Sequence, residues 1–145
     1  MTGVGAVLNT AQVPPGASMA VFGVGGIGLN CIQGGGLVAA NPIIAVDLLD
    51  DKLEYARSLG ATHTINASKD DPVERILEFT SGAGADYAFE AIGLVEEPVV
   101  QSIRCTRRRG VTVWVGHAPM NTPVTIDARD LMQEKTVMVF IHTQV

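Results

Sequence analysis

The sequence predicts one α/β domain, a doubly wound, six-stranded parallel sheet with helices on both faces. Short runs rich in apolar and β-branched residues alternate with helical segments along all 145 residues, which is typical of parallel strands joined by crossover helices. The second half of the chain repeats the β-α scheme of the first half. Right-handed crossovers and two such halves predict the strand order 3-2-1-4-5-6.

The strands are predicted from their composition and from the residues that end them. The first apolar run, 19–23, ends in glycines, and the second, 43–47, ends in an acidic residue. Short apolar runs with such boundaries indicate strands that are buried on both faces. The six predicted strands span residues 19–23, 43–47, 62–65, 86–90, 111–115 and 136–141.

The helices are predicted from apolar periodicity and from their end signals. Asp71 followed by Pro72 and Glu74 is a typical helix start, and Gly60 is a typical residue after a helix end. After an N-terminal helix and a Pro-Pro-Gly turn, the predicted helices span residues 27–39, 50–59, 71–80, 97–107 and 127–132. The first of these contains three glycines, 34–36. Each is less favourable than Ala by up to about 1 kcal/mol, so we expect this helix to fray or end early.

The composition restricts the class of protein. Hydrophobic residues make up 47% of the chain and charged residues 17%, so we expect one folded domain, residues 1–145. We expect a cytoplasmic protein that binds no membrane, because no apolar stretch is long and uninterrupted enough to span a bilayer and no signal peptide is recognisable. The formal net charge of −5 argues against a nucleic-acid partner.

Arginines and cysteines suggest local roles. We expect Arg104 and the run 107–109 to end a helix just before Gly110, where cations complement the helix dipole; a phosphate-binding or nucleic-acid-binding patch is the alternative. Cys31 and Cys105 are far apart and have no metal-binding spacing with the isolated histidines. We therefore expect two core thiols and no zinc site.

A glycine pattern follows the first predicted strand. The segment Gly23-Val24-Gly25-Gly26-Ile27-Gly28 fits Gly-x-Gly-x-x-Gly, opens a helix, and is followed by an acidic residue at the end of the next strand. Gly23 permits the tight turn, Gly25 lets the backbone approach a pyrophosphate, and Gly28 lets the helix pack against the strand. The positive end of the helix then holds the diphosphate, so the motif predicts a Rossmann dinucleotide site.

The acidic residue, Asp47, predicts which dinucleotide binds. A carboxylate here accepts hydrogen bonds from the adenosine ribose hydroxyls and repels a 2′-phosphate. The five residues after it contain no Arg, and their single cation, Lys52, stands beside two aspartates. The sequence therefore predicts NAD rather than NADP. A methyltransferase shares a glycine-rich first turn, but the complete glycine pattern argues against one.

With these residues, the chain resembles the coenzyme domain of zinc-dependent alcohol dehydrogenases in the medium-chain dehydrogenase/reductase family. The segment Phe-Glu-Ala-Ile-Gly, 89–93, is more similar to the alcohol dehydrogenases than to the zinc-free quinone reductases. The similar segments follow in order through nearly the whole chain, within residues 2–5, 20–29, 43–47, 51–62, 84–93 and 110–116.

The resemblance implies roles for particular residues. Ile27 and Thr2 would lie at the nicotinamide ring, and Lys52 would reach the adenosine ribose. Residues 92–93 would line the ribose pocket, and the carbonyl of Val115 would hold the carboxamide. The complete predicted cofactor-binding set is Thr2, Gly23, Gly25, Gly26, Ile27, Gly28, Asp47, Leu48, Lys52, Ala91, Ile92, Gly93 and Val115.

The resemblance also implies hydride transfer between NAD and an alcohol or aldehyde in the full-length protein. Family members are longer, and their zinc ligands and proton relay are expected in a catalytic domain that is missing from this chain. We therefore expect no catalytic or metal-binding residue here, and cofactor binding without turnover. The alternatives are a domain of a zinc-free enone or quinone reductase of the same superfamily and a non-catalytic nucleotide-binding module.

The last predicted strand, from Thr136 to Ile141, is apolar on both sides and would lie unprotected at an edge of the sheet. Similar dehydrogenases pair this edge with its twin across a two-fold axis. We therefore expect a homodimer.

Overall fold

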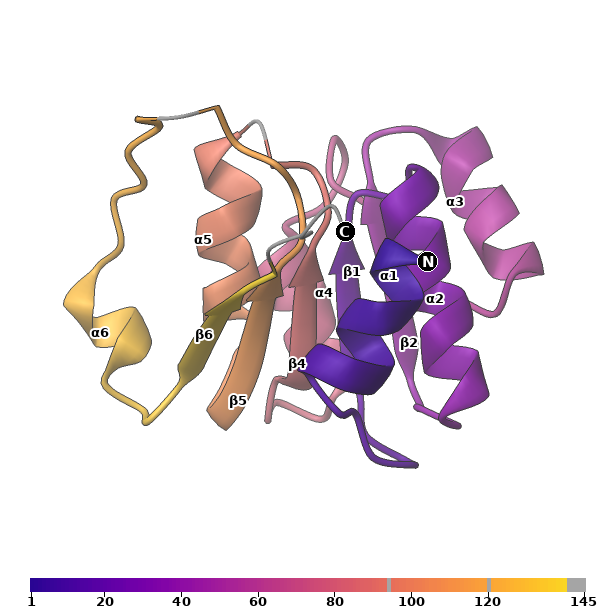
Figure 1. The fold of residues 1–145 in the computed structure, drawn as a ribbon, viewed down its shortest axis with the longest axis horizontal. Helices are drawn as coiled ribbons and strands as arrows, with labels where there is room; N and C mark the ends of the chain where they lie inside the picture. The colour runs from indigo at the N-terminus through magenta and orange to yellow at the C-terminus, as the bar shows by residue number, and fades with distance from the viewer. Residues whose placement is uncertain (94, 120, 141–145) are drawn as a thin grey trace.

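The computed structural model describes residues 1–93, 95–119 and 121–140, which form a six-stranded sheet flanked by helices (Figure 1). The strand order is β3-β2-β1-β4-β5-β6 and neighbouring strands are parallel, which confirms the predicted doubly wound sheet. The strands are β1 (Met19–Phe22), β2 (Ile43–Asp47), β3 (His63–Asn66), β4 (Ala85–Glu90), β5 (Thr106–Trp114) and β6 (Thr136–Val139). The helices are α1 (Thr2–Gly5), the π-helix η1 (Ala6–Thr10), α2 (Gly26–Leu37), α3 (Asp50–Ser58), α4 (Pro72–Phe79), α5 (Glu96–Arg104) and α6 (Ala128–Leu131).

The alternation of side chains along each strand divides the core into two apolar clusters. In β1, Met19 and Val21 belong to one cluster, and Ala20 and Phe22 belong to the other. The first cluster includes residues of η1, α2 and α3, and the second includes residues of α4 and the residue that follows α5. Helices therefore cover both faces, and this is why the central strands are continuous apolar runs in the sequence.

Helix α2 continues through its three consecutive glycines, so the expected early end was wrong. Gly34 and Gly35 are buried. A Cβ on Gly34 would lie 3.2 Å from the Cβ of Val7, and a Cβ on Gly35 would overlap the sulfur of Met19. These two glycines therefore let α2 approach η1 and β1 closely. Gly36 is exposed, and a Cβ there would meet nothing within 4 Å.

The arginine run lies in β5, so the expectation that all of it ends a helix was wrong. Helix α5 ends at Arg104, but residues 107–109 form an irregularity in β5, where the pairing with β4 shifts register. Arg107 forms an ion pair with Asp86 of β4. The charges of this run are held by carboxylates that the tertiary fold brings near, and a helix dipole is not their main partner.

The remaining boundaries agree with the prediction to within two residues, except that β5 begins at Thr106 and not at residue 111. Strand β6 forms an edge of the sheet with α6 outside it (Figure 1). The predicted end of this strand, Ile141, lies outside the described residues. In the described part of the chain, no helix has the length and apolar character needed to cross a membrane.

Candidate nucleotide-binding site

The site begins at the glycine turn between β1 and α2. Gly23 has a φ of +86°, a left-handed conformation that favours glycine. A Cβ on Gly28 would overlap the carbonyl oxygen of Gly23, so α2 packs too closely against the turn for any other residue. A Cβ on Gly25 would meet nothing within 4 Å. The turn therefore presents open backbone and the first N–H groups of α2, which is the geometry that binds an anion.

Asp47, the last residue of β2, holds this turn in place. Its Oδ2 accepts a hydrogen bond from the backbone N–H of Val24 at 2.9 Å. Its Oδ1 accepts hydrogen bonds from the N–H groups of Leu48 at 2.8 Å and Leu49 at 3.2 Å. A carboxylate has about four acceptor positions, so Asp47 can shape the turn and still accept a hydrogen bond from a ligand hydroxyl.

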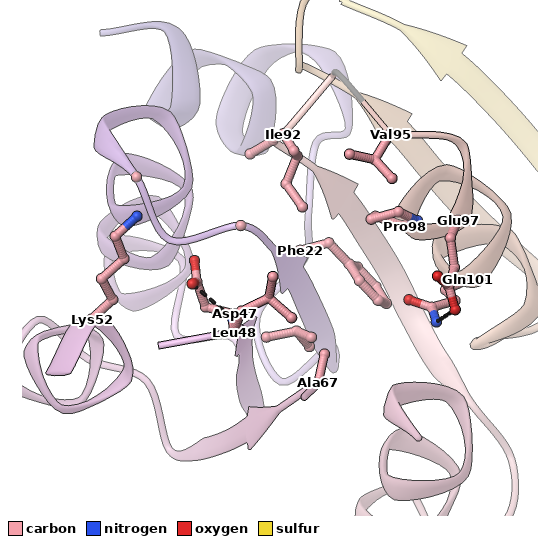
Figure 2. Close-up of a pocket in the computed structure, with 14 residues that line it drawn as sticks. Phe22, Asp47, Leu48, Lys52, Ala67, Ile92, Val95, Glu97, Pro98 and Gln101 are labelled. Carbon is pink, nitrogen blue, oxygen red and sulfur yellow. Dashed lines mark hydrogen bonds between the residues drawn. The ribbon is translucent and has the colours of Figure 1, made fainter. Parts of the chain in front are cut away.

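A pocket of about 430 Å³ opens in front of Asp47 (Figure 2). It lies at the carboxyl ends of β1, β2 and β4, where open parallel sheets bind their ligands. From the predicted cofactor-binding set, the pocket is lined by Gly23, Gly25, Asp47, Leu48, Lys52, Ala91 and Ile92. The fold therefore brings the glycine turn and the predicted ribose-binding residues to one cavity.

The other predicted residues do not line this pocket. They are Thr2, Gly26, Ile27, Gly28, Gly93 and Val115. Thr2 begins α1, which packs against α2, and Gly93 and Val115 are buried in the loops that follow β4 and β5. The residues predicted to contact the nicotinamide ring thus lie outside the cavity that holds Asp47.

Sequence reasoning missed half of the pocket wall. The additional lining residues are Phe22, Val46, Ala67, Val95, Glu97, Pro98 and Gln101. Phe22 and Val46 are strand residues that the apolar pattern assigns only to the core. Glu97 and Gln101 are one turn apart in α5, so a helical-face pattern could have grouped them, but only the tertiary fold brings α5 opposite Asp47.

Glu90, the last residue of β4, joins two loops at the same edge of the sheet. Its side chain is only 1% exposed, and its Oε1 accepts hydrogen bonds from the N–H groups of Ile92 and Gly93, both at 2.7 Å. Its backbone carbonyl accepts hydrogen bonds from the N–H groups of Val115 and Gly116, both at 2.8 Å. Burial raises the pKa of the Glu90 carboxyl, although the two backbone hydrogen bonds oppose this shift. Glu90 therefore fixes the loop that carries Ile92 to the pocket.

Comparison with known proteins identifies the family that combines this fold with this site. The family model described as zinc-binding dehydrogenase matches residues 26–144. The chain belongs to the zinc-binding dehydrogenase family. This is the family that the glycine turn, Asp47 and the segment 89–93 predicted.

Individual relatives of this zinc-binding dehydrogenase domain are named as dehydrogenases. The S-(hydroxymethyl)glutathione dehydrogenase of Synechocystis sp. is 46% identical over 120 residues, which are 81% of this chain and 32% of that protein. The structure of an alcohol dehydrogenase zinc-binding domain protein from Burkholderia ambifaria has a TM-score of 0.92 and 37% identity, over 97% of this chain and 38% of that chain. A structure from Sinorhizobium meliloti 1021 bound to NADP has a TM-score of 0.88 and 29% identity, over 95% of this chain and 41% of that chain. This chain thus spans about a third of the length of its curated relative.

The described side chains of this zinc-binding dehydrogenase domain offer no ligand set for a zinc ion. Among residues 1–93, 95–119 and 121–140, no three His, Cys, Asp or Glu side chains gather into a metal-binding group. Cys31 and Cys105 are fully buried, as predicted, and burial raises the pKa of each thiol to about 12. A cysteine binds zinc as a thiolate, so we assign no metal chemistry to Cys31 and Cys105.

Proposed function

We propose that this domain binds NAD(H) in the pocket in front of Asp47, and that the protein containing it is an NAD-dependent alcohol dehydrogenase. Hydride would pass between the dinucleotide and an alcohol or aldehyde. The observation that carries the proposal is the position of Asp47, which is hydrogen-bonded to the glycine turn and also lines the pocket. The family membership and the dehydrogenase names of the relatives support the class of reaction.

In the proposed complex each part of the dinucleotide meets a matching surface. The pyrophosphate lies over Gly25, where the N–H groups and the dipole of α2 favour negative charge. The adenosine ribose donates a hydrogen bond to Asp47 beside Lys52, and the base enters the apolar part of the pocket between Leu48 and Pro98 (Figure 2). A cavity of about 430 Å³ has room for the adenosine part of the dinucleotide.

The charges around Asp47 favour NAD over NADP. The relative from Sinorhizobium meliloti was solved with NADP, so similarity alone does not select the cofactor of this chain. A 2′-phosphate bound here would meet the Asp47 carboxylate, with Asp50 and Asp51 next along the chain. Asp50 already holds the ammonium of Lys69 at 2.6 Å. Among the described residues that line the pocket, Lys52 is then the one cation, and it follows two aspartates in the sequence.

A calorimetric titration of the chain with NADH and with NADPH tests this proposal. We expect saturable NADH binding, with NADPH weaker by about tenfold or more, since one hydrogen bond to a charged group contributes about 1.5–3 kcal/mol. In Asp47→Asn the preference should shrink, because the side chain keeps an acceptor oxygen for the turn but loses the charge. The matched control is Asp70→Asn, an exposed aspartate that does not line the pocket and lies outside the segment that follows Asp47. Absence of NADH binding would contradict the proposal.

We also propose that the chain alone binds the dinucleotide without turnover. Hydride transfer from an alcohol needs a Lewis acid or a base at the substrate oxygen, and the described residues gather no metal-binding group. Incubation of the chain with NAD and a panel of primary alcohols should give no NADH absorbance. Turnover with purified chain would contradict this proposal.

The exposed edge of the sheet supports a homodimer as the assembly. Strand β6 pairs with β5 on one side, and Val139 at its end is 61% exposed. Met132, just after α6, is also apolar and 77% exposed. An edge strand of this kind can pair with its twin. Sedimentation velocity should show a dimer that Val139→Lys weakens, and a wild-type monomer at micromolar concentration would refute the assembly.

A further inference from the structure

Polar side chains lie on opposite sides of the pocket, with apolar side chains between them. Asp47 and Lys52 lie on one side, Glu97 and Gln101 of α5 lie on the other, and Phe22 lies between them in the view (Figure 2). The Nε2 of Gln101 donates a hydrogen bond to the Oε1 of Glu97 at 3.2 Å. The proposed contacts with the pyrophosphate and the ribose do not use this pair, so its place on the pocket wall requires its own explanation.

We infer that Glu97 and Gln101 recognise the 6-amino group of adenine and disfavour dinucleotides whose base is a 6-keto purine. The inference rests on the proposed function, because it places the adenosine ribose at Asp47. It adds a base-specificity determinant that the glycine turn and Asp47 do not provide.

The position of the ribose fixes the direction of the base. A purine is joined to the ribose through N9, and its C6 lies on the opposite side of the ring system. With the ribose at Asp47, we place the base in the apolar slot of the pocket between Leu48 and Pro98. Leu48 and Ala67 line the slot on the side of β2 and β3. The far edge of the base, which carries the substituent at C6, then meets the side chains of α5.

The hydrogen-bonding capacity of the pair matches this edge of adenine. A carboxylate only accepts hydrogen bonds, and a carboxamide has one acceptor oxygen and two N–H donors. The internal hydrogen bond uses one donor of Gln101 and one position on Glu97, which leaves both acceptor and donor capacity. Adenine presents an amino donor beside a ring-nitrogen acceptor, the pattern that a Gln carboxamide binds through two hydrogen bonds. A 6-keto purine would instead place an acceptor oxygen opposite the Glu97 carboxylate.

A purely structural role of the pair predicts a different result. Polar side chains one turn apart stabilise a helix by about 0.2–0.5 kcal/mol wherever they occur. The hydrogen bond between Gln101 and Glu97, at 3.2 Å, is at the long end of the usual range, so it contributes little to the stability of α5. A structural pair would change the stability of the domain equally with or without ligand and would not distinguish one base from another.

The experiment compares NADH with reduced nicotinamide hypoxanthine dinucleotide, which differs by a keto oxygen in place of the 6-amino group. Both are titrated calorimetrically into the wild-type chain and into the double variant Glu97→Leu/Gln101→Leu. A two-bond contact of this kind contributes about 1–3 kcal/mol of discrimination. At tenfold for each 1.4 kcal/mol, we expect the wild type to bind NADH about fivefold or more tightly than the analogue. The double variant should bind the two within about twofold of each other.

Matched controls separate the specific effect from a general one. Gln33 of α2 and Glu54 of α3 are exposed residues off the pocket, so Gln33→Leu/Glu54→Leu should keep the wild-type ratio of affinities. Equal affinity of the wild type for both dinucleotides would overturn the inference and leave the proposed function standing. An unchanged ratio in Glu97→Leu/Gln101→Leu would also overturn it. Absence of NADH binding to the wild type would instead refute the proposed function and, with it, the inference.

Discussion

The three consecutive glycines of α2 differ in what surrounds them, and substituting each with alanine tests the packing of the helix. At the exposed Gly36, a methyl group meets open space. We expect Gly36→Ala to stabilise the domain by about 0.5–1 kcal/mol, because alanine loses less backbone entropy on folding and has the higher helix propensity. For a chain of 145 residues the entropy of unfolding is about 0.3 kcal/mol per kelvin, so Tm should rise by about 2–3 °C.

The same methyl group has the opposite effect at Gly35. It would overlap the Met19 sulfur and lie 3.2 Å from the Cδ1 of Ile43, and Met19 is completely buried, so its side chain has no free space to move into. Overpacking of this kind costs about 1–3 kcal/mol, which exceeds the gain in helix propensity. We expect Gly35→Ala to lower stability by about 1–2 kcal/mol and Tm by about 3–7 °C.

Thermal unfolding followed by far-ultraviolet circular dichroism measures these shifts, with urea unfolding as a second readout. Gly34→Ala should fall between the other two variants, because the contacts of its methyl group with Val7 are tight, at 3.2 and 3.3 Å, but do not overlap. If Gly36→Ala lowered Tm, or if Gly35→Ala raised it, the assignment of these glycines to close packing and to open solvent would be wrong.

Three further predictions concern the turn, the buried carboxyl and the thiols. Gly28→Ala should abolish NADH binding in calorimetry, because its methyl group would overlap the carbonyl oxygen of Gly23 and displace the turn. Burial raises the pKa of Glu90 above its usual 4.5, so the folded state holds this proton more tightly. Stability from this group is present below about pH 4.5 and is lost as pH rises through the folded pKa; Glu90→Gln should flatten that fall when urea unfolding is followed at increasing pH above about 4.5. Because the pKa of both Cys31 and Cys105 is raised to about 12, a thiol reagent at about pH 8 should modify them slowly in the native chain and rapidly in denaturant.

The sequence predicted the central strands β1 and β2 well, because both are buried on both faces and end at a recognisable residue. Strand β2 has the predicted bounds, 43–47, since Asp47 marks its end. Strand β5 was predicted to begin five residues too late, because its first part contains three arginines. Their place in the sheet depends on tertiary contacts such as the ion pair between Arg107 and Asp86, and a run of cations before a glycine is also the pattern of a helix end.

The glycine triplet of α2 is a second case in which a local sequence signal predicted the structure wrongly because tertiary packing decides it. Helix propensity is a local quantity, and it correctly describes three glycines as unfavourable. The approach of η1 and β1 to the helix is a tertiary property, however, and burial at Gly34 and Gly35 outweighs the local preference. A single sequence, taken by itself, contains no signal that distinguishes a glycine needed for close packing from a glycine that weakens a helix.

The pocket also has one part that motif spacing predicted and one part that depends on the tertiary fold. Its glycine turn and Asp47 are close in sequence, so the motif spacing predicted them together. Glu97 and Gln101 are about fifty residues away from Asp47 and reach the pocket because β4 pairs directly with β1, which places the helix after β4 across from the end of β2. Motif reasoning identifies the polar half that binds phosphate and ribose, whereas the half that meets the base depends on strand order.

The hydrogen bonds at this edge of the sheet indicate that the pocket is formed before any ligand binds. Asp47 ties the loop after β2 to the glycine turn after β1, and Glu90 ties the loops after β4 and β5 to each other. Each carboxylate replaces with protein donors the hydrogen bonds that a mobile loop would make with water. A preformed site loses less conformational entropy on binding, so more of the contact energy with a dinucleotide appears as affinity. These hydrogen bonds also explain why the buried Glu90 carboxyl is tolerated, since the two N–H groups that it accepts from offset part of its desolvation cost and order the loop after β4.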